Sequence, residues 1–66
     1  MKVLINGTKR EVQNGATLEQ LVALFRLQKK SIVLEHNHKV VDRNVYAATP
    51  IEENDIIEIV HFVGGG

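Results

Sequence analysis

The stretch Thr17-Leu18-Glu19-Gln20-Leu21-Val22-Ala23-Leu24-Phe25-Arg26-Leu27 decides the fold of this chain, because it has a helical pattern with one apolar face. Its apolar residues recur at intervals of three and four, which places them on a single stripe of a helix. Thr17 and Gln20 fit the capping box, in which the two side chains satisfy backbone N–H groups at the start of a helix. We therefore expect a helix from about Leu18 to Leu27, with its apolar stripe covered by a sheet.

Two strands are predicted before this helix. Residues 2–5 are rich in β-forming side chains, and residues 9–12 form a partly polar second segment. The Asn6-Gly7 pair between them is the strongest short signal for a hairpin turn. The chain is therefore expected to open with a β-hairpin.

The residues after the helix predict three more strands and a short helical turn. They give, in order, a strand at 31–36, a tight turn at Asn37-His38, a short strand at 39–41, a helical turn within 42–48 and a last strand from Ile56 to about Phe62. Thr49-Pro50 ends the helical turn, because the residue before a proline avoids helical backbone angles.

This order of elements predicts an α+β protein with the β-grasp (ubiquitin-like) fold. One main helix would lie across a mixed sheet of four or five strands, and a sheet is the smallest partner for its apolar stripe. The first and last strands would pair in parallel at the centre of the sheet, since a long connection joins them. We expect residues 1–62 to form this domain and residues 63–66 to form a flexible tail.

Size and composition exclude several classes of function. A chain of 66 residues has room for one small core and none for an enclosed active site. Eight Lys and Arg balance eight Asp and Glu, so no net field favours nucleic acid or an anionic membrane. The absence of cysteine excludes thiolate zinc sites and persulfide chemistry on this chain. No apolar run approaches the roughly 18 residues that span a bilayer, and no signal peptide is evident, so we expect a cytoplasmic protein that is monomeric when free.

The alternation of side chains along the last strand predicts two different sheet faces. Alternate residues of a strand point to opposite sides. If Ile57 and Ile59 pack against the helix, an outer apolar patch follows, made of Leu4, Ile56, Val60 and Phe62. A contiguous exposed apolar patch marks a contact site, so we interpret these four residues as a partner-docking patch. The alternative is that they are ordinary scattered surface residues.

The last four residues, Val63-Gly64-Gly65-Gly66, directly follow the apolar strand. Glycine has no Cβ, so such a segment fits a narrow channel in a partner, and its terminal group is the α-carboxylate. We interpret Gly66 as the reactive residue, and Val63, Gly64 and Gly65 as the part of the tail that enters partner active sites. The alternative is a frayed terminus.

The titratable side chains indicate no catalytic centre and no metal site. His36 and His38 are two residues apart, but no carboxylate or cysteine completes a ligand set. His61 is expected on the helix side of the sheet near its edge. Glu52-Glu53 is interpreted as a solvated turn, because no cleft is expected to shift either pKa.

The whole chain resembles the ThiS family of sulfur carriers in thiamine biosynthesis. The resemblance rests on the Asn6-Gly7 hairpin, the Thr17-capped helix, the Asn37 turn before residues 40–43, and above all Asn54-Asp55 leading to the Val-Gly-Gly-Gly end. It implies a carrier rather than an enzyme, with no bound cofactor. It also implies that a ThiF-type, E1-like enzyme uses ATP to adenylate Gly66, and that a donor protein's persulfide supplies sulfur for a thiocarboxylate. A ThiG-type thiazole synthase would consume that thiocarboxylate.

Two positions depart from the family pattern, and three other functions stay open. Glycine is frequent in the family where His38 stands, and proline where Asp42 stands; we expect His38 to sit in a turn type that needs no positive φ. The alternatives are a MoaD-type molybdopterin sulfur carrier, a ubiquitin-like modifier that forms isopeptide bonds through Gly66, and a non-covalent β-grasp interaction module. Removal of Gly65-Gly66 distinguishes the last of these, because only a pure binding module should tolerate it.

Overall fold

The computed structural model describes residues 1–62, so Val63, Gly64, Gly65 and Gly66 lie outside the described residues. The described elements are, in chain order, β1 (Lys2–Ile5), β2 (Thr8–Glu11), α1 (Leu18–Leu24), β3 (Ile32–His36), β4 (Lys39–Val40), the 3₁₀ helix η1 (Arg43–Ala48) and β5 (Ile56–His61). The predicted order of strands and helices is therefore confirmed.

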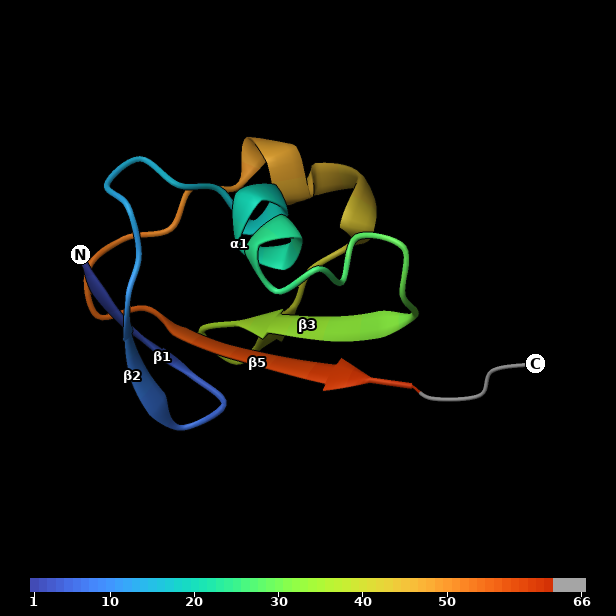
Figure 1. Cartoon of the computed structure of the whole chain (residues 1–66), viewed down its shortest axis with the longest axis horizontal. Coiled ribbons are helices and arrows are strands. Elements are labelled where there is room, and N and C mark those ends of the chain that lie inside the picture. The colour runs from blue at the N-terminus through green and yellow to red at the C-terminus, as the bar shows by residue number, and fades with distance from the viewer. Residues whose placement is uncertain (63–66) are drawn as a thin grey trace.

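The described strands form one mixed sheet with the order β2-β1-β5-β3-β4. The outermost strands of the sequence, β1 and β5, pair in parallel near its centre, and each also has an antiparallel neighbour. Both helices lie on the same side of this sheet (Figure 1). This is the β-grasp arrangement predicted from the helix stripe.

The core lies between α1 and the helix-side face of the sheet. Leu18 of α1, Leu34 of β3 and Ile57 of β5 are each 0% exposed, and Leu21 of α1 is 2% exposed. Full burial of one such side chain contributes about 1.5–3 kcal/mol, so the core depends on these few contacts. Tyr46 of η1 is buried against the same core, at 4% exposed.

Helix α1 begins as predicted but ends earlier. The Thr17 side chain accepts a hydrogen bond from the Gln20 backbone, and the Gln20 side chain accepts one from the Thr17 backbone, so the capping box is present. The helix ends at Leu24 rather than near Leu27, because Arg26 takes a left-handed φ of 60°. The N–H of Leu27 then donates to the carbonyl of Val22, and that of Arg26 to Ala23, which is the Schellman pattern of helix ends. No helix within the described residues is both long and apolar enough to cross a membrane.

Both hairpin turns have positive φ at their two central residues. The values are 51° and 81° at Asn6 and Gly7, and 52° and 72° at Asn37 and His38. Two such residues define the hairpin turn whose twist matches that of the strands. The expectation that His38 avoids positive φ is therefore wrong, because the two-residue connection from β3 to β4 requires this turn.

The strand boundaries differ slightly from the sequence prediction. Strand β2 spans Thr8–Glu11 rather than 9–12, and β4 contains only Lys39–Val40. Strand β5 ends at His61, yet the N–H of Phe62 still donates to the carbonyl of Ser31 at 2.9 Å. The pairing of β5 with the β3 side therefore extends to the last described residue.

Candidate functional site

Strand β5 carries the candidate site, because it leads directly to the four-residue tail. It lies between β1 and β3 and pairs with both, so it is held along both edges. Gly66 and the tail residues Val63, Gly64 and Gly65 lie outside the described residues, and their roles stay predictions. The described structure shows the platform from which the tail departs.

The outer face of the sheet carries three of the four predicted docking residues, and the fourth, Phe62, directly follows β5. Leu4 of β1 stands opposite Ile56 of β5, and both are half-buried. Val60 and Phe62 are 55% and 53% exposed. Their docking role stays a prediction, but Leu4, Ile56 and Val60 lie on the predicted side of the sheet, away from the buried Ile57 and Ile59.

Val33 belongs to this face and was missed by the sequence reasoning. It stands opposite Val60 in the antiparallel pairing of β3 with β5, and its side chain is 36% exposed. Opposite residues of a pair point to the same face of a sheet. The outward position of Val33 follows only from the register of β3 with β5, because the apolar run Ile32-Val33-Leu34 does not itself show which residue points outward.

A pair of glutamates divides the predicted patch into two parts. Glu58 lies between Ile56 and Val60 on the outer face of β5 and stands opposite Glu35 of β3. Leu4 and Ile56 form one part, where they line a hollow of about 240 Å³ together with Lys2 and Lys9. Val33, Val60 and Phe62 form the other part, at the end of β5 that leads to the tail. The apolar surface is therefore less contiguous than the sequence predicted.

Two asparagine side chains fix the backbone of β5. Oδ1 of Asn6 accepts from the N–H of Ile59 at 2.8 Å, and its Nδ2 donates to the carbonyl of the same residue at 3.2 Å. Oδ1 of Asn37 accepts from the backbone N–H of Ile56 at 2.8 Å, and the backbone N–H of Asn37 donates to the Ile56 carbonyl at 2.7 Å. The sequence reasoning assigned both residues to turns and missed this second role, which the amide's resemblance to a peptide group makes available.

A buried carboxylate joins the Asn37 turn to the loop before β5. Asp55 is 9% exposed, and its carboxylate accepts from Nε2 of His36 at 2.6 Å and Nδ2 of Asn37 at 3.0 Å. It also accepts from the backbone N–H of Glu52 at 2.8 Å. Burial acts to raise the pKa of Asp55, but the hydrogen bonds from His36, Asn37 and Glu52 and the charge of His36 outweigh it, so this pKa lies below its ordinary value of 3.8. The cluster therefore locks the start of β5 in place.

The three histidines have different surroundings. His61 lies on the helix-side face, as predicted, while His38 occupies the turn and His36 is bonded to Asp55. Within residues 1–62, no three His, Asp or Glu side chains are grouped to hold a metal ion. The structure therefore concentrates its candidate site on the outer face and end of β5.

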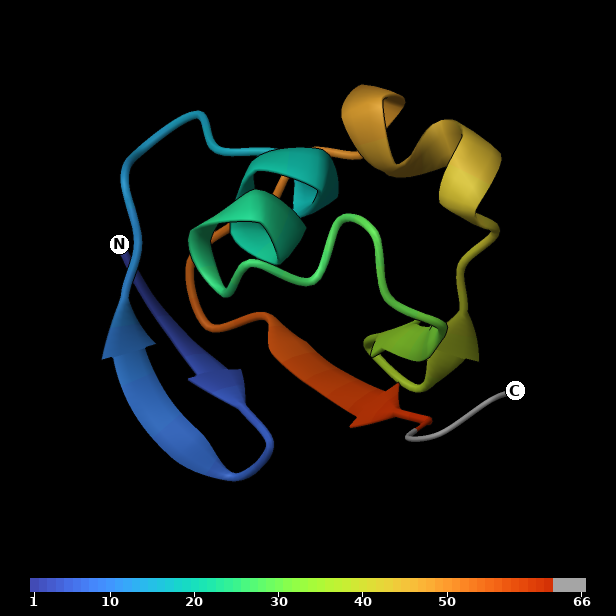
Figure 2. The same ribbon diagram turned by 45° about the vertical axis from the view of Figure 1, so that its right-hand side comes forward.

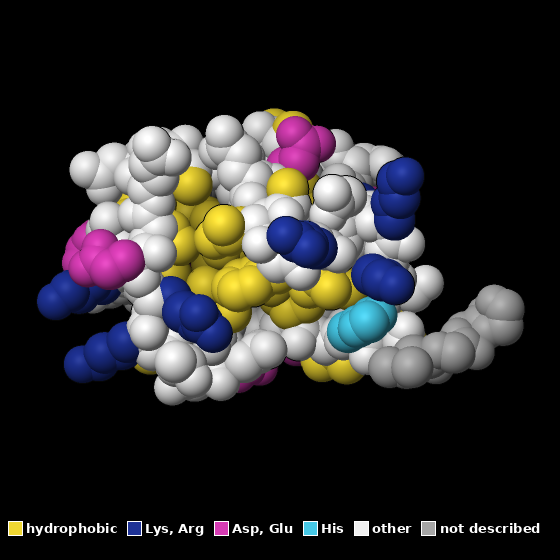
Figure 3. All heavy atoms as spheres, viewed as in Figure 1, with side chains coloured by type: hydrophobic (Ala, Val, Ile, Leu, Met, Phe, Trp, Pro, Cys, Tyr) yellow, Lys and Arg dark blue, Asp and Glu magenta, His cyan; other side chains and the backbone are white. Residues whose placement is uncertain are grey.

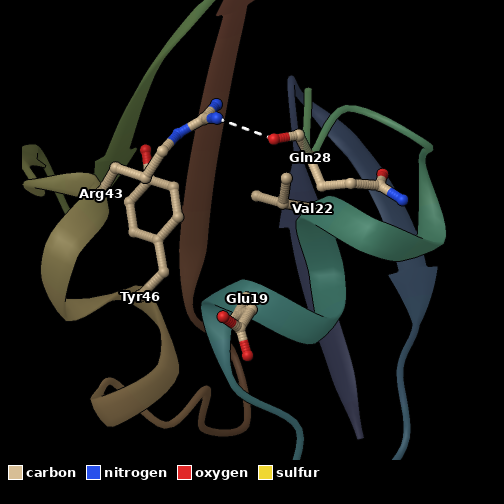
Figure 4. Close-up of a pocket in the computed structure, with 5 residues that line it drawn as sticks. All are labelled: Glu19, Val22, Gln28, Arg43 and Tyr46. Atoms are coloured by element: carbon tan, nitrogen blue, oxygen red, sulfur yellow. Dashed lines mark hydrogen bonds between the residues drawn. The ribbon is translucent and has the colours of Figure 1, made fainter. Parts of the chain in front are cut away.

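A small hollow between α1 and η1 has a structural explanation. It measures about 100 Å³, and Glu19, Val22 and Tyr46 form part of its wall. Figure 4 shows Arg43 reaching across from η1 to the carbonyl of Gln28. The Arg43 guanidinium donates to the carbonyls of Gln28 and Lys30 at 2.9 and 2.7 Å and lies 5.9 Å from the centre of the Tyr46 ring. Arg43 thus ties the loop after α1 to η1.

Comparisons with known proteins place this geometry in context. A model of the ThiS family matches residues 3–66. The sulfur carrier protein ThiS of Bacillus subtilis (strain 168) is 38% identical over 54 residues, which cover 82% of each protein. A thiazole synthase of Magnetococcus marinus is 39% identical over 66 residues, and this chain spans only 20% of that protein's length. The crystal structure of the thiamine biosynthesis protein ThiS from Geobacter metallireducens superimposes with a TM-score of 0.82 at 29% identity and full coverage of both chains.

Proposed function

This chain belongs to the ThiS family of sulfur carriers, and we propose that it carries the sulfur for thiazole formation in thiamine biosynthesis on the α-carboxyl group of Gly66. The observation that carries this proposal is that the family match continues beyond β5 through residue 66 and so includes the glycine tail. The sulfur carrier of Bacillus subtilis and the solved structure from Geobacter metallireducens support the same assignment.

The first chemical step is activation of the carboxylate by a ThiF-type enzyme. An α-carboxyl group with a pKa of about 3.3–3.7 is ionised at neutral pH, so its oxygen is a nucleophile but its carbonyl carbon is a poor acyl donor. In the proposed step a carboxylate oxygen of Gly66 attacks the α-phosphorus of ATP, and pyrophosphate leaves. The product is an acyl-adenylate, in which AMP is the leaving group for the next step.

The second step transfers sulfur from a persulfide of a donor protein. The terminal persulfide sulfur attacks the Gly66 carbonyl carbon and displaces AMP, which gives an acyl disulfide. A thiol of the donor system then attacks the sulfur–sulfur bond, so that the thiocarboxylate is released and a disulfide remains on the donor. This chain contains no cysteine, so every thiol in the sequence of steps belongs to a partner.

The consumer of the thiocarboxylate is a ThiG-type thiazole synthase. Support comes from the thiazole synthases of Magnetococcus marinus and Paramagnetospirillum magneticum, which align with all 66 residues of this chain over 20% of their own length. If the carrier passes its sulfur directly to the synthase, a carrier-like segment within the synthase chain would bring the two reacting groups together.

The role of the described residues in this proposal is to present the tail. Strand β5 is held at Ile56 by Asn37 and at Ile59 by Asn6, so the point at which the tail begins is fixed relative to the sheet. Val60 and Phe62 stand beside that point on the outer face and supply apolar contact to a partner. Binding energy from this surface offsets the roughly 1–2 kcal/mol per residue needed to order a glycine tail in a partner's channel.

The experiment that tests the proposal is pyrophosphate release by the cognate ThiF-type enzyme with ATP. The intact chain should support release, and a variant that lacks only Gly66 should not. A charge-neutral control, Val45→Ser, changes an exposed residue of η1 and should leave release unchanged. Release that persists without Gly66 would overturn the proposal, and capture of the activated glycine by protein lysines would identify a modifier instead.

A further inference from the structure

Strand β2 presents an open hydrogen-bonding edge. It is the first strand in the order of the described sheet, with β1 on one side only. The N–H of Val12 donates to the carbonyl of Met1, and the Met1 amino group donates back to Val12, so these two residues form a hydrogen-bonded pair. Such pairs alternate along antiparallel strands, which leaves the backbone N–H and C=O groups of Lys9 and Glu11 pointing away from β1. These two residues offer four backbone groups to an added strand.

A groove lies beside this edge, between β2 and the end of α1. It consists of a hollow of about 240 Å³, where Leu24 supplies the exposed apolar surface beside the buried Val12 and Leu21, and one of about 390 Å³, where the half-buried Phe25 and Leu27 lie beside the buried Ile5 and Ile59. Leu24 is 66% exposed, the second most exposed of the large apolar side chains of residues 1–62. Figure 3 shows hydrophobic side chains gathered on this face of the molecule, with basic side chains next to them.

The groove is open because α1 is short. Arg26 ends the helix with its left-handed φ, so α1 does not continue over the sheet beyond Leu24. Ile5 and Ile59 are buried at this end, at 7% and 9% exposed, and the half-buried Phe25 and Leu27 form the accessible apolar wall. Figure 2, in which the ribbon is turned by 45°, shows the hairpin of β1 and β2 to one side of α1.

The charges around the groove differ between its two hollows. The titratable side chains that line the larger hollow are Arg10 and His61, and the guanidinium of Arg10 lies 5.6 Å from the centre of the Phe25 ring. The smaller hollow has one titratable residue in its wall, Glu11, which stands opposite Lys2 and points to the outer face of the sheet. A carboxylate on a bound segment is therefore favoured beside the larger hollow, next to Arg10.

We propose that β2 and this groove bind an extended segment of a partner protein, which adds to the sheet as a further strand. The segment has two apolar side chains two positions apart, one for each hollow, because alternate residues of a strand point to the same face. It also has an acidic residue two positions beyond the apolar side chain in the larger hollow, on the same face of the added strand, where it meets Arg10. This surface lies on the helix side of the sheet, so the proposal does not depend on the outer patch or on the chemistry of Gly66.

The test is selection of displayed random peptides on the intact chain, followed by mapping of the selected peptides by NMR. The expected peptides alternate apolar and polar residues and place Asp or Glu two positions beyond one end of the apolar pair, on the same face. On binding, the amides of Lys9 and Glu11 should become protected from hydrogen exchange, and those of Leu24 and Phe25 should shift. Failure to enrich any such peptide, or shifts centred on Val60 and Phe62, would overturn the proposal. Self-association through β2 in place of peptide binding would overturn it as well.

Matched variants separate this surface from general stickiness. Leu24→Ser should weaken the selected peptides about tenfold, since an apolar contact of about 1.4 kcal/mol is lost. Val40→Ser removes an equally exposed side chain, at 69% against 66%, from the opposite edge strand and should have no effect. Arg10→Glu should reverse the preference, so that peptides with Lys in place of the acidic residue bind better. Equal losses for Leu24→Ser and Val40→Ser, with both variants folded, would contradict the assignment.

Discussion

Asparagine has two roles at each end of β5. Asn6 and Asn37 adopt the positive φ that their turns need, and their side-chain amides also bond the backbone of Ile59 and Ile56. The left-handed backbone conformation costs asparagine less free energy than most residues, because its short polar side chain forms local hydrogen bonds. The turn role could be predicted from the Asn-Gly signal, whereas the bonds to β5 could not, since they join residues 53 and 19 positions apart.

Asn6→Gly isolates the second role of this asparagine, because glycine accepts positive φ without cost. We expect the free energy of unfolding to fall by about 1–2 kcal/mol, as two hydrogen bonds to a part-buried strand are lost. Urea unfolding measures this change, and hydrogen exchange at Ile59 should accelerate. An unchanged or increased stability would show that the amide contributes nothing beyond the turn. The control is Asn44→Ala in η1, for which we expect the free energy of unfolding to change by no more than about 0.5 kcal/mol.

Asp55 predicts a specific dependence of stability on pH. Its pKa is lowered in the folded state, so its stabilising effect is complete above the ordinary value of 3.8 and is lost as the pH falls through the lower, folded-state pKa. Asp55→Asn should cost about 1–3 kcal/mol at neutral pH, because a buried set of hydrogen bonds is disrupted. The variant should also lose less stability than the parent as the pH falls from above 3.8 through the lower, folded-state pKa of Asp55. Parallel curves of stability against pH for the two proteins would contradict this role.

At the scale of elements, the sequence predicted what local patterns encode. The capping box of Thr17 and Gln20 and the Asn6-Gly7 turn were both read from neighbouring residues and are both present. The end of α1 was not predicted correctly. Glycine is the usual sign of a left-handed residue after a helix, and Arg26 takes that conformation without being a glycine. The outward position of Val33 and the opposition of Glu35 to Glu58 also escaped, since cross-strand register depends on pairing between distant segments.

For the Asn37-His38 turn we predict that substitution by glycine raises the free energy of unfolding, whereas Asn6→Gly lowers it. His38 has a φ of 72°, a left-handed conformation that costs a side chain with Cβ roughly 1 kcal/mol relative to glycine. His38→Gly should therefore raise the free energy of unfolding by up to about 1 kcal/mol, although glycine adds freedom to the unfolded chain. Thermal and urea unfolding measure the change. Gly7→Ala, at a φ of 81° with nothing within 4 Å of the added Cβ, should destabilise through the backbone alone. A loss of stability in His38→Gly would show that the histidine side chain makes a contribution larger than its strain.

At the scale of the whole molecule, the sheet separates two surfaces. The outer face carries Val33, Val60 and Phe62 beside the start of the tail, while the groove beside β2 opens on the helix side. Strand alternation was enough to predict the outward position of Val60, but that of Val33 follows only from its pairing with Val60. The groove was not predicted, because it depends on how the end of α1 and the loop after it, with Leu24, Phe25 and Leu27, lie beside β2.

Phe62→Asp tests the outer face as a docking surface for the activating enzyme. Phe62 is 53% exposed, so a charge there should leave the stability of the fold within about 0.5 kcal/mol of the parent. The affinity for a ThiF-type enzyme should fall at least tenfold, because a carboxylate would be desolvated at an apolar contact. Val45→Asp, which places the same charge on η1 at a residue that is 46% exposed, is the matched control and should retain affinity. Equal affinity of both variants would remove the outer patch from the account.

The most direct measurement of the central claim is the mass of the C-terminal peptide of the protein isolated from its native host. Replacement of one carboxylate oxygen of Gly66 by sulfur should appear as the corresponding gain in mass on that peptide, and treatment with an alkylating reagent should add one label there. Oxidation of Met1 adds nearly the same mass, so the gain must be mapped to the peptide that contains Gly66. A mass gain on this peptide that depends on the activating enzyme is the predicted result. An unmodified Gly66 peptide in cells that are actively making thiazole would contradict the account.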